Sequence, residues 1–131
     1  MRLAIIIGAL ALAGCAANAE LQKAEDARAS RELADALKDR VAGEPQDCIS
    51  NNALQGPQVI DSRTILYTQG RRVWRNDLLA ECPGLRPFNT LIVEVHGSQI
   101  CRHDRFRAVE PGARIPGPYC SFGRFTPYER R

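Results

Sequence analysis

The sequence predicts a mainly β protein, in which an N-terminal export signal and a helix precede a small antiparallel meander or half-barrel stapled by two disulfides. Three observations predict this fold class. The chain has only 131 residues, of which 6% are aromatic, so its hydrophobic core must be small. Short apolar segments separated by turn residues fill its second half. It also contains five cysteines, and disulfides commonly stabilise small exported domains.

The N-terminus has the pattern of an export signal. Arg2 precedes an apolar segment, residues 3–12, which is shorter than the roughly 20 residues that a membrane-spanning helix needs. The segment ends in Leu-Ala-Gly-Cys, which resembles the lipobox of bacterial lipoproteins, whose cysteine thiol receives diacylglycerol. We therefore predict a signal peptide over residues 1–14 and a lipid anchor at Cys15 that makes the membrane a partner.

Two neighbouring features refine this prediction. Ala16 follows the cysteine, and in Gram-negative lipoproteins this resembles the pattern that sorts proteins to the outer membrane. We expect the protein at the periplasmic face of that membrane. Residues 17–19, Ala-Asn-Ala, are an alternative site for ordinary signal peptidase, which would leave Glu20 as the first residue.

The number of cysteines agrees with lipidation. If Cys15 carries the lipid, four cysteines remain, which is the even number that two disulfides require. Four cysteines allow three pairings. We favour Cys82 with Cys101, which would join a turn to the next strand, and Cys48 with Cys120, which would join the start of the β domain to its last strand.

Residues 20–42 consist mostly of good helix formers and contain neither proline nor glycine, so we predict one helix there. Its first half is nearly all alanine and charged residues. Its second half has a narrow apolar stripe of Leu33, Leu37 and Val41. We interpret residues 15–47 as the lipidated cysteine and a helical spacer; the alternative is that the stripe docks onto the domain or a partner.

Residues 48–131 form the predicted β domain. Apolar and polar residues alternate with a period of two in several short segments, as in half-buried strands. Residues 110–118 contain three prolines and two glycines and are predicted to form a loop. The predicted strands are residues 59–67 and 72–76, which flank a hairpin turn at 68–71, followed by residues 91–95, 99–102, 105–109 and 119–125.

Charge is distributed unevenly. Residues 20–47 have a net charge of −3, whereas residues 48–131 have a net charge of +5, carried entirely by arginine. A guanidinium group suits phosphate and carboxylate, so one interpretation is a binding module for an anionic envelope ligand. The other is that GC-rich codon usage produces the arginines; nucleic acid is not expected outside the inner membrane. The candidate anion-binding residues are Arg71, Arg72, Arg75, Arg102, Arg105 and Arg107.

A zinc site is the first chemical alternative. Cys82, Cys101, His103 and Cys120 are residue types that bind zinc. Zinc sites normally have ligands in two closely spaced pairs, and here only Cys101 and His103 are close. We therefore expect no metal and no cofactor.

A small periplasmic hydrolase is the second alternative. His103 and Asp104 suggest a base and its carboxylate, with Ser98 or Ser121 as nucleophile. Adjacent residues of a strand point to opposite faces, which argues against such a pair. We predict that the protein is not an enzyme.

Trp74, which lies among three arginines in the sequence, is predicted to be a core residue. The alternatives are that it stacks with arginine or forms part of a binding face.

Four stretches of the chain form a recognisable pattern: Cys48-Ile49, residues 59–65, residues 78–85 with Cys-Pro-Gly-Leu at their end, and residues 101–106 with 120–127. Together they resemble a family of small exported proteobacterial proteins, often lipoproteins, that is defined only as a domain of unknown function. The resemblance implies no known activity. It implies a glycine before Asp104, where this chain has His103, and it draws attention to Asp61, Arg63 and Asp104, for which we favour a structural role, since Asp61 and Ser62 are good turn residues.

The leading interpretation is a non-enzymatic cell-envelope lipoprotein that serves as a structural or interaction module. Its partner would be an unknown envelope protein or an anionic ligand.

Overall fold

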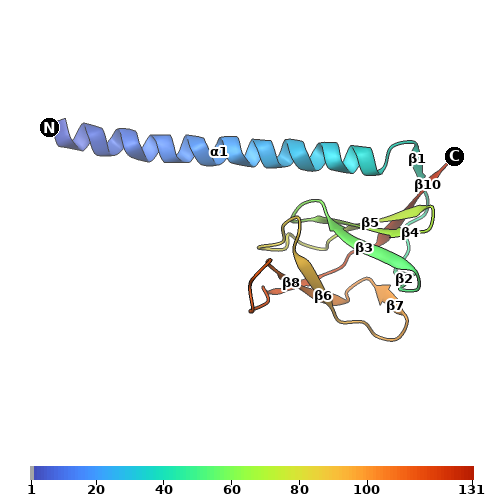
Figure 1. The fold of residues 1–131 in the computed structure, drawn as a ribbon. Helices are drawn as coiled ribbons and strands as arrows, with labels where there is room; N and C mark the ends of the chain where they lie inside the picture. Colours follow the sequence, from blue (N-terminus) through green and yellow to red (C-terminus); the bar gives the residue numbers. More distant parts are fainter. Residues whose placement is uncertain (1) are drawn as a thin grey trace. The chain divides into compact units, whose positions relative to one another are not determined.

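The computed structural model describes the backbone of residues 2–131 and the side chains from Ala17 onward (Figure 1). The predicted lipidation of Cys15 therefore lies outside the described side chains. The chain forms two compact units, residues 1–32 and 33–131. Helix α1 (Arg2–Ala36) precedes ten strands in the described residues. The strands are β1 (Arg40–Ala42), β2 (Cys48–Ser50), β3 (Leu54–Val59), β4 (Thr64–Gln69), β5 (Arg72–Asp77), β6 (Thr90–Val93), β7 (Gln99–Cys101), β8 (Arg105–Val109), β9 (Tyr119–Ser121) and β10 (Phe125–Arg130).

Helix α1 ends earlier than the composition predicts. The prediction of helix through residue 42 is wrong, because Asp39 adopts a left-handed conformation with φ of 58° that ends the helical path. Arg40–Ala42 then pairs with β10 as an edge strand. Pairing with a neighbouring strand thus outweighs the helix propensity of Arg40 and Ala42, because propensity is a weak determinant compared with tertiary contacts. In the part of the chain with described side chains, no helix has the length and apolar content to cross a membrane.

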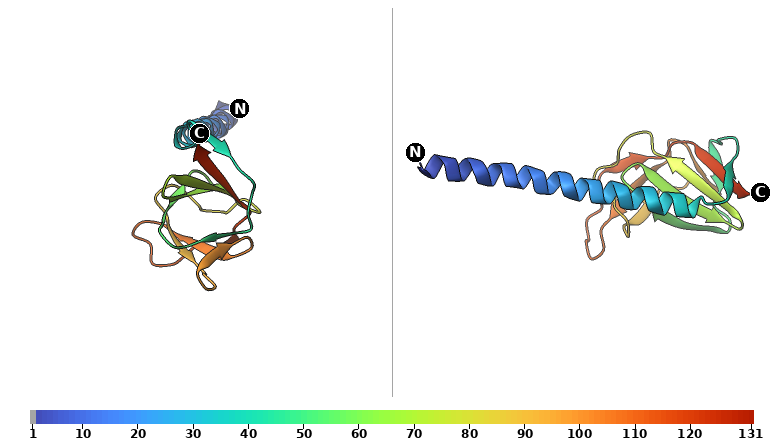
Figure 2. Two further views of the ribbon diagram at one scale, coloured as in Figure 1. Left: turned by 90° about the vertical axis from the view of Figure 1, so that its right-hand side faces the viewer. Right: turned by 90° about the horizontal axis from the view of Figure 1, so that it is seen from above.

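The strands form three antiparallel sheets, so the prediction of a mainly β fold is confirmed. The largest has five strands in the order β1-β10-β5-β4-β3, and β3, β4 and β5 form the expected meander. Strand β10 joins β5 to β1, which places the last strand between early ones. The smaller sheets are β2-β7 and β6-β8-β9, the latter called the three-stranded sheet below. Figure 2 shows the strands curling around a common interior.

The predicted hairpin is confirmed, with Gly70 at φ of 61° and Arg71 between β4 and β5. The single strand predicted over residues 59–67 is wrong. A turn separates β3 from β4, and in it the Asp61 carboxylate accepts a hydrogen bond from Arg63 N at 2.8 Å. Asp61 therefore has the structural role expected of an aspartate that initiates a turn.

The core of the β unit is built from aromatic rings of distant segments. Phe122 packs against Phe106 of β8 at a centroid distance of 4.7 Å and against Phe125 of β10 at 5.7 Å. Trp74 is also buried, as predicted, and donates a hydrogen bond to Gln69 at 3.1 Å. The guanidinium of Arg72 lies 5.0 Å from the Trp74 ring centroid, so this residue is both core and an arginine-stacking partner.

Tyr67 contributes an unusual polar atom to this core. Its side chain is buried, and its hydroxyl has no hydrogen-bond partner among the described residues. Burial raises the pKa of Tyr67 because the phenolate would lose its hydration. The hydroxyl thus stays neutral and adds bulk next to Phe122 rather than charge.

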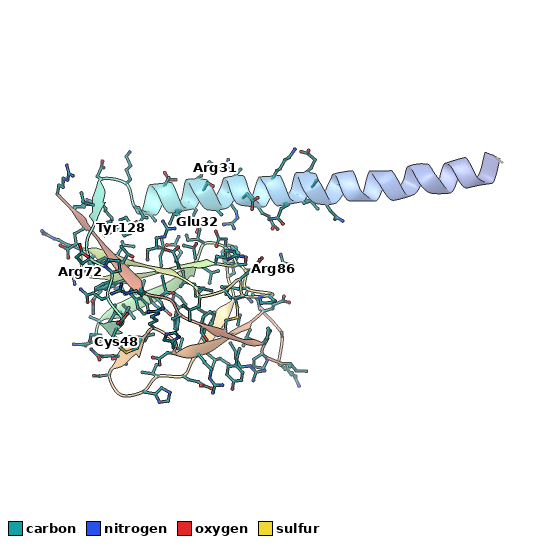
Figure 3. The ribbon with its side chains drawn as sticks, turned by 180° about the vertical axis from the view of Figure 1, so that it is seen from behind. Arg31, Glu32, Cys48, Arg72, Arg86 and Tyr128 are labelled. Atoms are coloured by element: carbon teal, nitrogen blue, oxygen red, sulfur yellow. A yellow bond between two sulfur atoms is a disulfide. The ribbon has the colours of Figure 1, made fainter. Side chains whose placement is uncertain are left out.

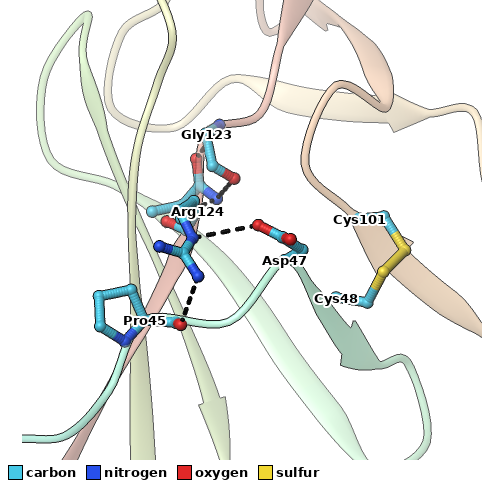
Figure 4. Close-up of polar contacts among 7 residues, drawn as sticks. Pro45, Asp47, Cys48, Cys101, Gly123 and Arg124 are labelled. Carbon is cyan, nitrogen blue, oxygen red and sulfur yellow. Dashed lines mark hydrogen bonds and ion pairs between the residues drawn. A yellow bond between two sulfur atoms is a disulfide. The ribbon is translucent and has the colours of Figure 1, made fainter.

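Asn76 fixes the chain before β10. Its side chain is fully buried, donates a hydrogen bond to Gly123 O at 2.9 Å and accepts one from Gly123 N at 3.0 Å. The next residue, Arg124, bonds Asp47 at 3.1 Å and the carbonyl of Pro45 at 2.9 Å (Figure 4). These contacts connect the start of the β domain to its last strand.

Four cysteines form two disulfides, as predicted, but the favoured pairing is wrong. The bonds join Cys48 to Cys101 and Cys82 to Cys120. Strand β2 pairs with β7 rather than with the last strands, so Cys48 lies directly opposite Cys101 with 4.0 Å between the Cα atoms. We predicted a disulfide between the start of the β domain and its last strand. That connection is instead made by backbone hydrogen bonds between Gln46 and Phe125 and by the hydrogen bonds of Arg124.

Candidate functional site

The six arginines predicted to bind anions do not form one face. Arg71, Arg72 and Arg75 belong to β5 and the turn before it, in the five-stranded sheet. Arg105 and Arg107 belong to β8 in the three-stranded sheet, and Arg102 lies in the turn after β7. Figure 3 shows Arg72 near Tyr128 on the five-stranded sheet, on the other side of the domain from Arg86.

Two of the candidate arginines of the five-stranded sheet have acidic partners. Arg72 forms an ion pair with Glu129, and Arg75 forms one with Asp77 at 2.8 Å. Burial lowers the pKa of Arg75, but its hydrogen bond and attraction to Asp77 outweigh this effect, so the pKa is raised. Arg71 and Arg102 are exposed. The carboxylates of Glu129 and Asp77 therefore offset the positive charge that Arg72 and Arg75 would offer to an incoming anion.

The arginines of the three-stranded sheet surround one aromatic ring. The guanidinium groups of Arg105 and Arg107 lie 4.5 Å and 5.0 Å from the ring centroid of Tyr119. Arg105 also pairs with Glu94 at 3.1 Å. Arg107 donates hydrogen bonds to the carbonyls of Gly117 at 2.8 Å and Pro116 at 3.1 Å. Arg107 thus fixes the loop before β9 as well as the ring.

The two faces of this sheet differ as the alternation predicts. Phe106 and Ala108 are buried, whereas the arginines of β8 point outward. On the outer face Ile92, Arg107 and Tyr119 form a row across the three strands, because each is the register partner of the next. Ile92 and Tyr119 are each about half exposed, at 50% and 51%. Arginine, tyrosine and apolar side chains in one exposed row are typical of binding surfaces.

Two loops extend from one end of this sheet, and we call them the end loops. They comprise residues 83–89, which lead into β6, and residues 110–118, which connect β8 to β9. Thr90 follows the first loop and Val109 precedes the second. Because these two residues are register partners, both loops join the sheet at the same end. The Cys82–Cys120 disulfide connects their bases. The loop predicted at residues 110–118 is thereby confirmed.

The end loops have a defined shape. In the first, Leu85 is buried in the core and Asn89 donates backbone and side-chain hydrogen bonds to the carbonyls of Arg86 and Gly84. In the second, Gly117 N bonds the carbonyl of Ala108 at 2.8 Å. Each loop nevertheless exposes a large apolar side chain, Phe88 in the first and Ile115 in the second, and sequence reasoning did not single out either residue.

The hypothetical hydrolase pair is arranged as a turn. The Asp104 carboxylate accepts a hydrogen bond from Cys101 N at 2.7 Å, and Asp104 N donates to Cys101 O at 3.1 Å. His103 adopts φ of 72°, a left-handed conformation that favours glycine. This is the position where the family resemblance implies glycine. The carboxylate is thus bound to the turn's own backbone.

The three cysteines among the hypothetical zinc ligands are oxidised. Cys82, Cys101 and Cys120 are all disulfide-bonded, so none of them presents a thiolate in this state. Among the described residues, no three histidine, cysteine or acidic side chains are grouped as metal ligands.

His103→Gly is expected to raise the free energy of unfolding by up to about 1 kcal/mol, because glycine adopts a left-handed conformation without the steric cost that other residues have. Urea denaturation monitored by Trp74 fluorescence measures the change. Arg102→Gly is the matched control and should lower stability, since Arg102 is not in that conformation. A loss of stability in His103→Gly would show that the imidazole makes a stabilising contact.

A protein-family model matches the whole chain, residues 1–131. The chain belongs to DUF6491. This is a family of unknown function, and the resemblance noted from the sequence is confirmed at that level. Lipidation and the cysteine pattern of the DUF6491 family remain predictions. No curated protein matches the chain, and no solved structure matches it.

Several important residues of this DUF6491 protein were missed from the sequence. Asn76 and Gly123 gave no signal, because their role depends on a contact between distant segments. Phe88 and Ile115 did give a signal: each is a large apolar residue next to proline in a segment with loop composition. Such a residue is either buried under the loop or exposed on it, and the structure shows the second arrangement.

Proposed function

We propose that this DUF6491 protein is a cell-envelope lipoprotein whose β domain is a non-enzymatic interaction module. The observation that carries the proposal is the use of its cysteines. All four cysteines of the β unit pair with one another, and Cys15 remains at the end of the lipobox-like segment. Structural disulfides are typical of oxidising compartments, which fits export.

The interaction surface in this proposal is the outer face of the three-stranded sheet together with the end loops. Tyr119, Ile92 and Arg107 supply residue types that contribute strongly to binding, and the end loops add two exposed apolar side chains. The non-enzymatic part of the proposal is supported by Asp104, whose carboxylate is bound to backbone. We propose an envelope component as the partner.

Cys15→Ser tests the lipid anchor. We expect the variant to lack acylation and to be released from membranes, because each buried CH₂ of an acyl chain contributes about 0.8 kcal/mol to membrane binding and serine lacks the thiol that accepts the lipid. Mass spectrometry of the mature protein and membrane fractionation measure the two effects. Ala19→Gln, which alters only the alternative cleavage site, should behave like the natural protein. A mature protein that begins at Glu20 would contradict the proposal.

A further inference from the structure

The end loops expose the two least buried large apolar side chains among the described residues. Phe88 is 91% exposed and Ile115 is 83% exposed. Phe88 also adopts φ of 71°, which is unfavourable for a bulky residue. A strained backbone that keeps a phenyl ring in water is a feature that often accompanies function.

Positive charge predominates next to these side chains. The end loops contain two arginines, Arg86 in the first and Arg114 in the second, and one acidic residue, Glu110, where the second loop begins. Arg105 and Arg107 lie on the adjoining sheet. Figure 1 draws both end loops on the same side of the β domain, and Figure 3 places Arg86 on the side opposite Arg72. Apolar side chains beside positive charge complement a bilayer with anionic headgroups.

The loops are held in place before any ligand arrives. The Cys82–Cys120 disulfide joins their bases, Leu85 anchors the first in the core, and Arg107 binds two carbonyls of the second. A surface that is already ordered loses little conformational entropy on binding. The two exposed apolar side chains lie on different loops at one end of the three-stranded sheet.

We propose that the end loops are a contact site for an anionic phospholipid surface, in which Phe88 and Ile115 enter the interfacial region and Arg86 and Arg114 face the headgroups. The inference rests on the proposed envelope location, because the domain must lie near a bilayer. It deepens that proposal by naming lipid as a direct partner of the β domain, in addition to the lipid at Cys15.

The experiment places a fluorescent reporter on the first end loop of the full-length protein. Phe88→Trp adds an exposed tryptophan, while the natural Trp74 is buried and gives a constant background. The matched control is Val95→Trp, because Val95 is also exposed but follows β6 at the opposite end of the sheet. Both variants are mixed with vesicles of phosphatidylcholine and phosphatidylglycerol in equal parts, with or without brominated acyl chains.

We expect brominated lipid to quench the tryptophan at position 88 and shift its emission to the blue, and to leave position 95 unchanged. Adding Arg86→Glu and Arg114→Glu to Phe88→Trp should weaken the quenching severalfold, as should vesicles of phosphatidylcholine alone. Equal thermal unfolding midpoints check that the variants fold.

Vesicle flotation of the same samples reports the anchor separately. Chains that float while position 88 remains unquenched would overturn the inference and leave the lipoprotein proposal intact. Absence of quenching in chains that do not float would overturn it too. A blue shift without lipid quenching, accompanied by a larger particle in light scattering, would assign the end loops to a protein contact and equally overturn it.

Discussion

Gly123→Ala should lower the free energy of unfolding by about 3 kcal/mol or more, a large part of the stability of a small domain. A Cβ at this position would lie 1.9 Å from the carbonyl oxygen of Asp77 and 3.1 Å from its carbonyl carbon. Both are backbone atoms, so no side-chain rotation relieves the overlap. The segment must move away from β5, which also breaks the buried hydrogen bonds with Asn76.

Gly97→Ala is the control for this prediction. Gly97 has φ of 79° but open space around its Cβ position, so alanine there meets only the conformational cost of about 1 kcal/mol. Urea denaturation of the two variants gives both values. Equal losses in the free energy of unfolding of the two variants would show that the close approach of Gly123 to the backbone of Asp77 does not contribute to the effect of Gly123→Ala.

The second large effect concerns the disulfides. Replacing either pair of cysteines by alanine should cost about 4 kcal/mol from the chain entropy of the unfolded state, because loops of 53 and 38 residues differ little on a logarithmic scale. The burial of the cysteines then decides which of the two double substitutions lowers the free energy of unfolding more. Cys82 is 1% exposed and Cys120 is 8% exposed, within the core, whereas Cys48 and Cys101 are half-buried in a two-stranded ladder. Removing the core sulfurs adds a cavity cost.

We therefore expect the Cys82→Ala, Cys120→Ala variant to unfold at a lower denaturant concentration than the Cys48→Ala, Cys101→Ala variant. Chemical denaturation of both, beside the oxidised natural protein, measures the ranking. The reverse order would mean that packing around the core sulfurs contributes less than the tie between β2 and β7. Peptide mapping of the oxidised protein checks the pairing independently.

Local patterns in the sequence predict the parts of the fold that local physics controls. The alternation in residues 105–109 correctly places Phe106 and Ala108 inside, and the Gly70-Arg71 turn is where the hairpin prediction puts it. Arg40–Ala42 could not be predicted, because a segment that prefers helix becomes a strand only through β10, far along the chain. The cysteine pairing fails for the same reason, since it depends on which strands become neighbours.

The candidate site shows the same division. Arginine content suggested one charged face, but the sheets separate these residues and give several of them acidic partners. Loop composition predicted where the chain would be irregular without predicting which apolar side chains would be exposed. Leu85 and Phe88 lie three residues apart in one loop, yet the first is buried and the second is almost fully exposed. Only the path of the backbone through the fold decides between them.

The two disulfides overlap along the chain, since Cys82 lies between Cys48 and Cys101, and Cys101 lies between Cys82 and Cys120. A single cut by a protease anywhere between Cys48 and Cys101 leaves both fragments joined through the first bond. A cut between Cys101 and Cys120 leaves them joined through the second. Both end loops fall within this range, so a molecule nicked at Phe88 or Ile115 would still carry the whole β domain as one covalent assembly until its disulfides are reduced.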